Sequence, residues 1–270
     1  MPESVDIAAF LEEVLQSAKY NRLSRGLVSK IAAEELKNQG NKTKAIKTTR
    51  TRLHRLAGAF IPTNINYAQW LDKLQDQPSF RAPEHLEKLK QVMRLHASTS
   101  ERLPYLEFIY KDLFSLIPSP QSILDLACGL HPLAIPWMPI TADIEYQACD
   151  IVLPMLNFLS TYFETFRPQT HIFECDILET QPNQTFDLII LLKTMPLLAQ
   201  MDKTAPEKLL NTLNFRHMIV SYPLKSLGRQ NKGMEKTYRA QFEALLEKKS
   251  FKVQEYAVAN ELFFILSHHD

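Results

Sequence analysis

The chain has 270 residues, which suggests one large domain or two smaller ones. Its 31 basic and 30 acidic residues leave a net charge of only +1, and a hydrophobic content of 45% is ordinary for a protein that buries a core. No apolar run reaches the ~18 residues of a membrane span, and acidic residues stand where a signal peptide would be basic. The cysteines are few and have no CxxC spacing, which argues against a disulfide scaffold or a metal site. We therefore expect a cytoplasmic protein without a membrane segment or a bound metal.

Basic residues are concentrated in the first part of the chain. Up to residue 120 there are 18 basic and 13 acidic residues, and after it 13 and 17. The strongest bias lies in residues 37–55, which contain no acidic residue and these seven basic ones: Lys37, Lys42, Lys44, Lys47, Arg50, Arg52 and Arg55. Such a cluster indicates a polyanionic partner, and the alternative is the solvated face of a helix.

The first 115 or so residues have the periodicity of amphipathic helices. Apolar residues recur every three or four positions in the segments 9–18, 25–36, 45–61, 64–76, 83–98 and 104–117. Pro62 marks a break between two of these segments, and Pro83 suits the first turn of the helix that it begins. We therefore expect an N-terminal region made of helices alone.

From residue 122 onward, short apolar runs alternate with helical segments. The runs lie at 122–127, 146–151, 170–177, 186–193 and 217–223, and the helices at 154–166, 205–213 and 232–249. This alternation predicts a parallel sheet with helices on both faces. The last two strands, 251–258 and 261–268, are joined by only Ala259 and Asn260, so they must pair antiparallel. A Rossmann-like α/β sheet of seven strands with an antiparallel final hairpin is typical of class I S-adenosylmethionine-dependent methyltransferases.

Candidate ligand-binding residues follow successive strands of this predicted sheet. Gly129 is the one glycine in the loop after the first strand, so the GxGxxG pattern of dinucleotide binding is absent. Asp150 ends the second strand, 21 residues after Gly129, which is the spacing of an acid that meets ribose hydroxyls. Asp176 ends the third strand, where a carboxylate can accept a hydrogen bond from an adenine amino group. Each acid alone could be a helix cap, but two beside the glycine turn favour a nucleoside site.

Several long segments resemble one family, the aminoglycoside-resistance 16S rRNA methyltransferases that modify N7 of guanine 1405. The matching segments are 50–60, 96–110, 124–138, 149–151, 191–196 and 220–247, among them LDLACGLHPLAIPWM and VSYPLKSLGRQNKGMEKTYRAQFEALLE. This chain departs from the family pattern at a few positions. The family usually has Asn at His131 and Asp at Val152, and commonly Arg at Ser100 and Phe at Tyr222.

The resemblance implies S-adenosyl-L-methionine as the cofactor and assigns residues to it. They are Thr99, Arg102, Gly129, Asp150, Asp176, Ile177 and Leu192. Arg102 is a plausible bidentate partner for the methionine carboxylate. No general base is needed, because N7 of guanine carries a lone pair and no proton. Candidates to lie near the methyl group or the target base are Lys193, Tyr222 and Met234. Lys193 could instead face solvent at its strand end, and Tyr222 could instead be a core residue.

The resemblance also implies a helical docking domain at 1–104, a methyltransferase domain at 105–270 and a monomer that acts on 16S rRNA in the assembled 30S subunit. The RNA-binding candidates are Lys44, Lys47, Arg50 and Arg52 in the basic window and Lys225, Arg229 and Lys232 in the loop 221–234. The product would exclude kanamycin- and gentamicin-type drugs. Open alternatives are methylation of another position, such as adenine 1408, and a ribosome-binding protein without catalysis. A nicotinamide-dependent oxidoreductase is disfavoured by the missing glycines.

Overall fold

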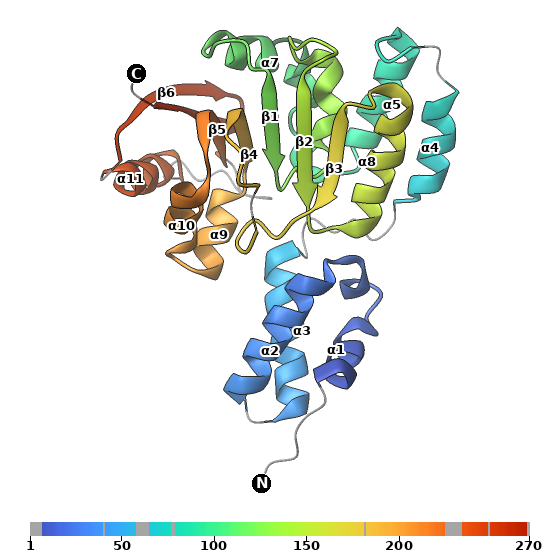
Figure 1. Ribbon diagram of the computed structural model, residues 1–270, viewed down its shortest axis with the longest axis vertical. Helices are drawn as coiled ribbons and strands as arrows, with labels where there is room; N and C mark the ends of the chain where they lie inside the picture. The colour runs from blue at the N-terminus through green and yellow to red at the C-terminus, as the bar shows by residue number, and fades with distance from the viewer. Residues whose placement is uncertain are drawn as a thin grey trace.

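The computed structural model describes residues 7–39, 41–57, 65–76, 79–180, 182–224, 234–247 and 249–268. At its centre is a seven-stranded sheet in the order β3-β2-β1-β4-β5-β7-β6, with helices on both faces (Figure 1). The strands are β1 Ser122–Leu126, β2 Glu145–Asp150, β3 Thr170–Glu174, β4 Phe186–Leu192, β5 Phe215–Pro223, β6 Phe251–Val258 and β7 Glu261–His268. Strands β1 to β5 run parallel and β7 pairs antiparallel with both β5 and β6. The predicted fold and its antiparallel final hairpin are confirmed.

The apolar runs of the central strands reflect burial on both faces of the sheet. In β4, Leu188 and Ile190 contribute to the core on one face. Ile189 and Leu191 contribute to the core on the other face, and all four side chains are buried. Because both faces of the strand are covered, residues 188–192 of β4 form a continuous apolar run instead of alternating with polar residues.

Helices form a layer on each face of the sheet. The helices are α1 Ile7–Leu15, α2 Arg25–Gln39, α3 Lys42–Ala57, α4 Tyr67–Gln75, α5 Pro83–Met93, α6 Ala97–Ser100, α7 Leu106–Ser115, α8 Leu153–Phe166, α9 Met195–Met201, α10 Ala205–Thr212 and α11 Met234–Leu246, with 3-10 turns η1 Tyr20–Arg22, η2 Leu103–Tyr105 and η3 His131–Trp137. Helices α7 and α8 share one core with the sheet, and α9, α10 and α11 share the other. No helix among the described residues is long and apolar enough to cross a membrane.

Three elements differ from the sequence-based expectation. The helix expected at 83–98 is interrupted after Met93, and α6 follows as a separate short helix. The strand expected at 170–177 ends at Glu174. The Cys175 N–H still bonds to the Asp150 carbonyl at the end of β2, and the chain then turns into a loop. Helix α9 was not predicted. It begins just after Lys193, whose φ of +57° turns the chain sharply out of β4.

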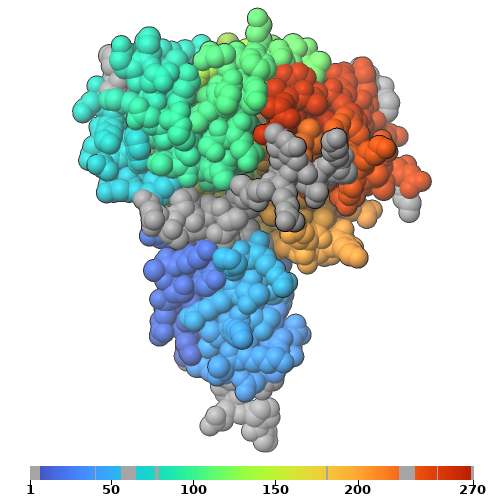
Figure 2. Space-filling view, turned by 180° about the vertical axis from the view of Figure 1, so that it is seen from behind, coloured from blue at the N-terminus to red at the C-terminus, as the bar shows by residue number. Residues whose placement is uncertain are grey.

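The N-terminal helices divide into two groups. Helices α1 to α3 form a lobe that projects below the sheet, with most of its surface exposed (Figures 1 and 2). Helices α4, α5 and α7 lie instead beside the sheet, where α4 packs against α8 and both α5 and α7 pack against η3. The lobe is attached through a bridge between Leu23 and Val152 and a 2.8 Å bond from the Ser24 N–H to the Ile151 carbonyl. The boundary near residue 104 thus stays a prediction, and the packing favours a smaller N-terminal lobe that ends with α3.

A buried hydrogen bond ties α5 to α8. The His85 Nε2 atom lies 2.7 Å from the Tyr162 hydroxyl, and both side chains are fully buried. Burial also lowers the pKa of His85 to about 4, so the ring is neutral at pH 7. The contact fixes a helix of the N-terminal region onto the layer that covers the sheet.

Replacing Tyr162 by Phe should reduce the free energy of unfolding by about 1–3 kcal/mol, because it leaves a buried polar nitrogen without its partner. Urea unfolding followed by circular dichroism measures the change. The matched control is Tyr110→Phe, since the buried Tyr110 hydroxyl has no hydrogen-bond partner among the described residues. Equal losses in the two variants would show that the His85 contact contributes nothing.

Candidate functional site

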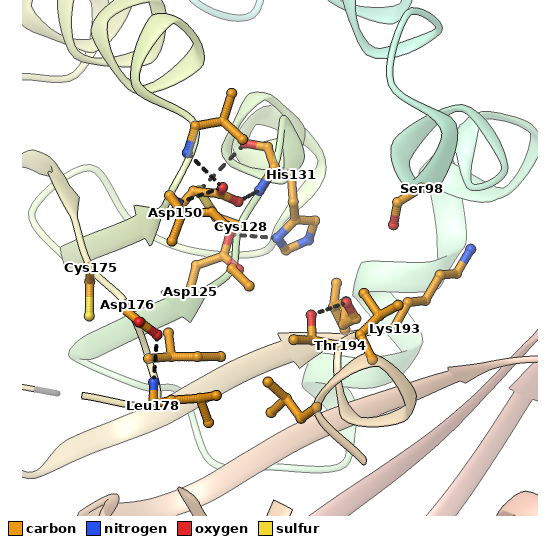
Figure 3. A pocket seen from close by; sticks show the side chains of 18 of the residues that line it. Ser98, Asp125, Cys128, His131, Asp150, Cys175, Asp176, Leu178, Lys193 and Thr194 are labelled. Carbon is orange, nitrogen blue, oxygen red and sulfur yellow. Dashed lines mark hydrogen bonds and ion pairs between the residues drawn. The ribbon is translucent and has the colours of Figure 1, made fainter. Parts of the chain in front are cut away.

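A cavity lies where the parallel strands β1 to β4 reach their carboxyl ends (Figure 3). This is the edge at which doubly wound sheets bind their ligands. The predicted residues that line it are Arg102, Gly129, Asp150, Asp176, Ile177, Leu192 and Lys193. Those that the sequence did not assign include His96, Ser98, Asp125, His131, Thr194 and Leu197.

Gly129 is required by the close approach of another part of the chain. Its φ is +54°, a left-handed backbone conformation that residues other than glycine rarely adopt. A Cβ atom there would also lie 2.7 Å from Cε1 of His96, whose ring is buried against the loop. The glycine therefore lets the loop after β1 close over His96 at the cavity wall.

Asp150 organises the loops around the cavity. Its carboxylate accepts three backbone N–H groups, from Gly129 at 2.9 Å, Ile151 at 2.7 Å and Val152 at 3.2 Å. Burial raises the pKa of Asp150, while these three donors act in the opposite direction. The acid joins the loop after β1 to the loop after β2 and keeps a carboxylate at the cavity wall.

Asp176 marks the other end of the cavity. Its Oδ1 atom accepts the Leu178 N–H at 3.1 Å, and burial raises the pKa of this carboxyl, while that donor and Lys30 act against the rise. Ile177 and Leu178 provide apolar surface beside it. A carboxylate next to apolar surface suits a flat heterocycle that carries a donor group.

Asp125, His131 and Tyr146 form a buried polar cluster that the sequence did not reveal. Oδ2 of Asp125 lies 2.7 Å from Nδ1 of His131 and accepts the Tyr146 hydroxyl at 2.9 Å. All three side chains are at most 2% exposed. The sequence reveals only two things about His131. Its spacing from other residues is not that of metal ligands, and the family pattern has Asn at its position. Its place at the cavity wall depends on the turn at Gly129.

Arg102 and Lys193 are held by carboxylates at the cavity edge. Glu261 accepts two hydrogen bonds from Arg102, at 2.9 Å from Nε and 2.6 Å from Nη2. Lys193 forms ion pairs with Glu101 and with Glu261, and its side chain points away from the cavity centre (Figure 3). Burial by itself would raise the pKa of Glu261, but the two cations outweigh it and hold that pKa below its usual value. The Lys193 ammonium is thus paired within the protein, and its side chain is only 9% exposed.

Two predicted site residues lie outside the cavity. The Thr99 hydroxyl donates to the carbonyls of Met93 and His96, and it is Ser98 that lines the cavity instead. The Tyr222 ring is buried against Tyr238, Phe242 and Phe264. In this structure the Thr99 hydroxyl closes the α6 turn, and the Tyr222 ring lies in the core, which is the alternative that the sequence left open.

The predicted RNA-binding residues differ in their surroundings. Lys44 and Lys47 are exposed on α3, as are Lys42 and Arg55. Arg50 donates to the Glu13 carbonyl at 2.6 Å. Arg52 bridges Glu34 at 2.9 Å and Glu35 at 2.8 Å, so its charge is neutralised within the lobe. Lys225, Arg229 and Lys232 lie outside the described residues, as does the side chain of Met234.

Comparisons with known proteins agree with this geometry. The family model described as ribosomal RNA methyltransferase (FmrO) matches residues 16–265. A protein of Frankia casuarinae named 16S rRNA (guanine(1405)-N(7))-methyltransferase is 33% identical over 259 residues, covering 94% of this chain and 91% of the relative. One of the same name from Serratia marcescens is 32% identical over 261 residues, covering 95% and 96%.

Two solved structures of 16S rRNA methyltransferases share the whole fold. The 16S rRNA methyltransferase RmtF in complex with S-adenosyl-L-homocysteine superposes with a TM-score of 0.83 at 27% identity, covering 97% of this chain and 98% of that one. The 16S rRNA methylase RmtB superposes with a TM-score of 0.76 at 26% identity, covering 98% and 99%. The similarity therefore extends over the helical lobe as well as the sheet.

Replacing Asp150 by Ala should weaken S-adenosylhomocysteine binding by at least about tenfold, since it removes a carboxylate from the cavity wall and leaves three backbone N–H groups without their acceptor. Isothermal titration calorimetry measures the affinity. The control is Asp72→Ala, because Asp72 is an exposed carboxylate on α4. Unchanged affinity in the Asp150 variant would show that Asp150 does not contribute to ligand binding.

Proposed function

Because the chain belongs to the ribosomal RNA methyltransferase (FmrO) family, we propose that it transfers a methyl group from S-adenosylmethionine to N7 of guanine 1405 in 16S rRNA. The observation that carries the proposal is the cavity at the strand ends, with one acid at the end of β2 and another just after β3. Relatives that match nearly the whole length of this chain bear the name of that activity. Modification of N7 would confer resistance to kanamycin- and gentamicin-type aminoglycosides.

The residues of the cavity fit the chemical groups of the methyl donor. Asp150 would accept from the ribose hydroxyls and Asp176 from the adenine amino group, with Ile177 and Leu192 as apolar walls. Glu261 already engages Nε and Nη2 of Arg102, so contact with the methionine carboxylate would fall to Nη1. The buried Nε2 of His131, which has no partner among the described residues, supports a polar surrounding for the methionine end.

The protein's task in this reaction is alignment. The sulfonium of the cofactor supplies an already activated methyl group, and guanine N7 supplies a lone pair without a proton to remove. No side chain has to act as a general base. The cavity has to hold N7 in line with the methyl group and exclude water, which converts an encounter of two molecules into a step within one complex.

The target base must leave its RNA helix before N7 can reach the cavity. Enzymes that act on a stacked base turn it out of the helix at a cost of a few kcal/mol. We propose that Lys225, Arg229, Lys232 and Met234 contact the base and its phosphates, as the resemblance to the family implies. Strand β5, which precedes these residues in the chain, lies beside β4 in the sheet. Methylation of N7 adds a positive charge and removes a major-groove acceptor, which would alter drug contacts.

The lobe of α1 to α3 would dock on the assembled 30S subunit. Lys44 and Lys47 are exposed on one side of this lobe, and contacts from lysines to phosphates position a protein without reading sequence. We propose that a monomer binds, with the lobe on the rRNA surface and the cavity over the target.

The experiment that tests the proposed function is mapping of 7-methylguanosine. Purified protein and S-adenosylmethionine are incubated with 30S subunits, the RNA is reduced and cleaved with aniline, and reverse transcription locates the cleavage. A new stop at guanine 1405 is the expected result. A stop elsewhere, such as near adenine 1408, would show that the protein methylates another nucleotide. Absence of any stop while the cofactor still binds would favour a ribosome-binding protein without this activity.

Replacing Lys44, Lys47 and Arg50 together by Gln should weaken 30S binding and leave S-adenosylhomocysteine binding unchanged. Each lost phosphate contact should also reduce the slope of log affinity against log salt concentration by about one. Filter binding over a range of salt concentrations measures both quantities. Arg50 also donates a hydrogen bond to the Glu13 carbonyl, so its replacement changes the structure of the lobe as well as its charge. The double variant Lys44→Gln, Lys47→Gln keeps that hydrogen bond and removes charge alone.

The matched control removes three lysine charges elsewhere, at Lys111, Lys203 and Lys252, which are all exposed. It should bind 30S subunits as the wild type does. Equal binding by the wild type and by the α3 variants would show that the basic window is only a solvated helix face.

A further inference from the structure

We propose that His131 binds the α-amino group of the cofactor's methionine end, and that Asp125 is the positioning residue that makes this possible. The proposal rests on S-adenosylmethionine as the methyl donor and does not depend on which RNA is methylated. It concerns a side chain that differs from the Asn usual at this place in the family.

One nitrogen of the His131 ring has a partner, and the other has none among the described residues. Nδ1 lies 2.7 Å from Oδ2 of Asp125. Nε2 is buried without a hydrogen-bond partner, although the side chain is only 2% exposed. A buried polar atom without a partner is costly, so natural proteins keep one mainly where a ligand or water will meet it.

The unpartnered edge of the ring faces the cavity. His131 lines the same cavity as Arg102 and Asp150, and its edge opposite Asp125 is turned toward the space bounded by Ser98, Lys193 and Thr194 (Figure 3). This space lies on the side of the Gly129 loop away from Asp176. The polar end of a ligand whose adenine lies at Asp176 would therefore reach His131.

The hydrogen bonds of Asp125 determine what Nε2 can do. The Asp125 carboxylate accepts the Tyr146 hydroxyl at 2.9 Å and can only accept from His131 as well, so the His131 proton is on Nδ1. In the neutral ring Nε2 is then an acceptor. A methionine end offers one donor group, its α-ammonium, while its carboxylate is the natural partner of an arginine such as Arg102.

The nearby charges favour an ammonium at this place. Arg102 and Lys193 are paired with Glu261 and Glu101, whereas Asp125, Asp150 and Asp176 add negative charge to the cavity wall. A cationic group that meets Nε2 of His131 thus enters a region of negative charge. His131 would select cofactors that carry an amino acid over adenosyl thioethers that lack it.

Two variants separate the two ring nitrogens. In His131→Asn the amide reaches the place of Nδ1, so the contact with Asp125 can persist while nothing reaches the place of Nε2. In His131→Gln the amide reaches the place of Nε2 and restores an acceptor there. We expect the Asn variant to fold and bind S-adenosylhomocysteine about ten- to hundredfold more weakly, and the Gln variant to recover part of that loss.

Calorimetry with three ligands tests the inference. His131→Asn should bind S-adenosylhomocysteine about ten- to hundredfold more weakly than the wild type does. The affinity for 5′-methylthioadenosine, which lacks the amino acid, should agree within about twofold. The deamino analogue of S-adenosylhomocysteine should also bind both proteins equally. The control His85→Asn removes a buried histidine outside the cavity and should leave all three affinities unchanged.

A measurement on the wild type covers the case in which a variant does not fold. The 15N resonance of Nε2 of His131 should move on addition of S-adenosylhomocysteine and stay in place on addition of 5′-methylthioadenosine. Equal weakening of all three ligands in His131→Asn, or equal 15N shifts with both ligands, would overturn the inference and leave the proposed function intact. If the wild type binds no S-adenosylhomocysteine, the donor assignment and this inference both fail.

Discussion

A buried carboxylate, Glu261, holds together three parts of the chain that are far apart in sequence. It begins β7, accepts two bonds from Arg102 next to α6 and one from the Ser221 hydroxyl in β5, and lies 3.4 Å from the Lys193 ammonium after β4. Arg102 is only 3% exposed and Glu261 4%. Removing one partner of such a pair leaves an uncompensated buried charge, which typically costs about 3–5 kcal/mol. The geometry of the cavity edge depends on this cluster.

The Glu261 cluster also shapes the electrostatics of the site. Because the two nearest cations are neutralised by Glu261 and Glu101, the cavity wall keeps the negative charge of its three aspartates. A sulfonium cofactor is itself cationic at its reacting centre and carries an ammonium. Pairing within the protein thus leaves the cavity suitable for a cationic ligand, although an arginine and a lysine line it.

The division of the N-terminal helices separates two tasks. Helices α4, α5 and α7 complete the layers around the sheet, and the buried His85–Tyr162 contact belongs to that packing. Helices α1 to α3 project from the sheet and present exposed lysines. Their attachment through Leu23 and Ser24 reaches Ile151 and Val152, which directly follow Asp150 at the end of β2. Leu27 of α2 also lines the cavity and Lys30 pairs with Glu179, so the lobe contacts the cavity region at more than one point.

The sequence by itself determined the strands, the final hairpin and the acidic residues at the edge of the cavity. Apolar runs buried on both faces specify the strands, the two-residue connection specifies the final hairpin, and acids at strand ends specify the cavity, because parallel strands end at the same edge. Local pattern carries this information, since burial and turn geometry act on neighbouring residues.

Only the tertiary structure decided which side chains face the cavity. Arg102 and Glu261 are 159 residues apart, and nothing in either segment indicates the other. His131 enters the cavity wall after the turn at Gly129, and that turn closes over His96, a contact between segments far apart in sequence. Tyr222 is a core residue because α11 packs on β5. Periodicity shows that a residue is buried, but its partner is set by which elements pack together.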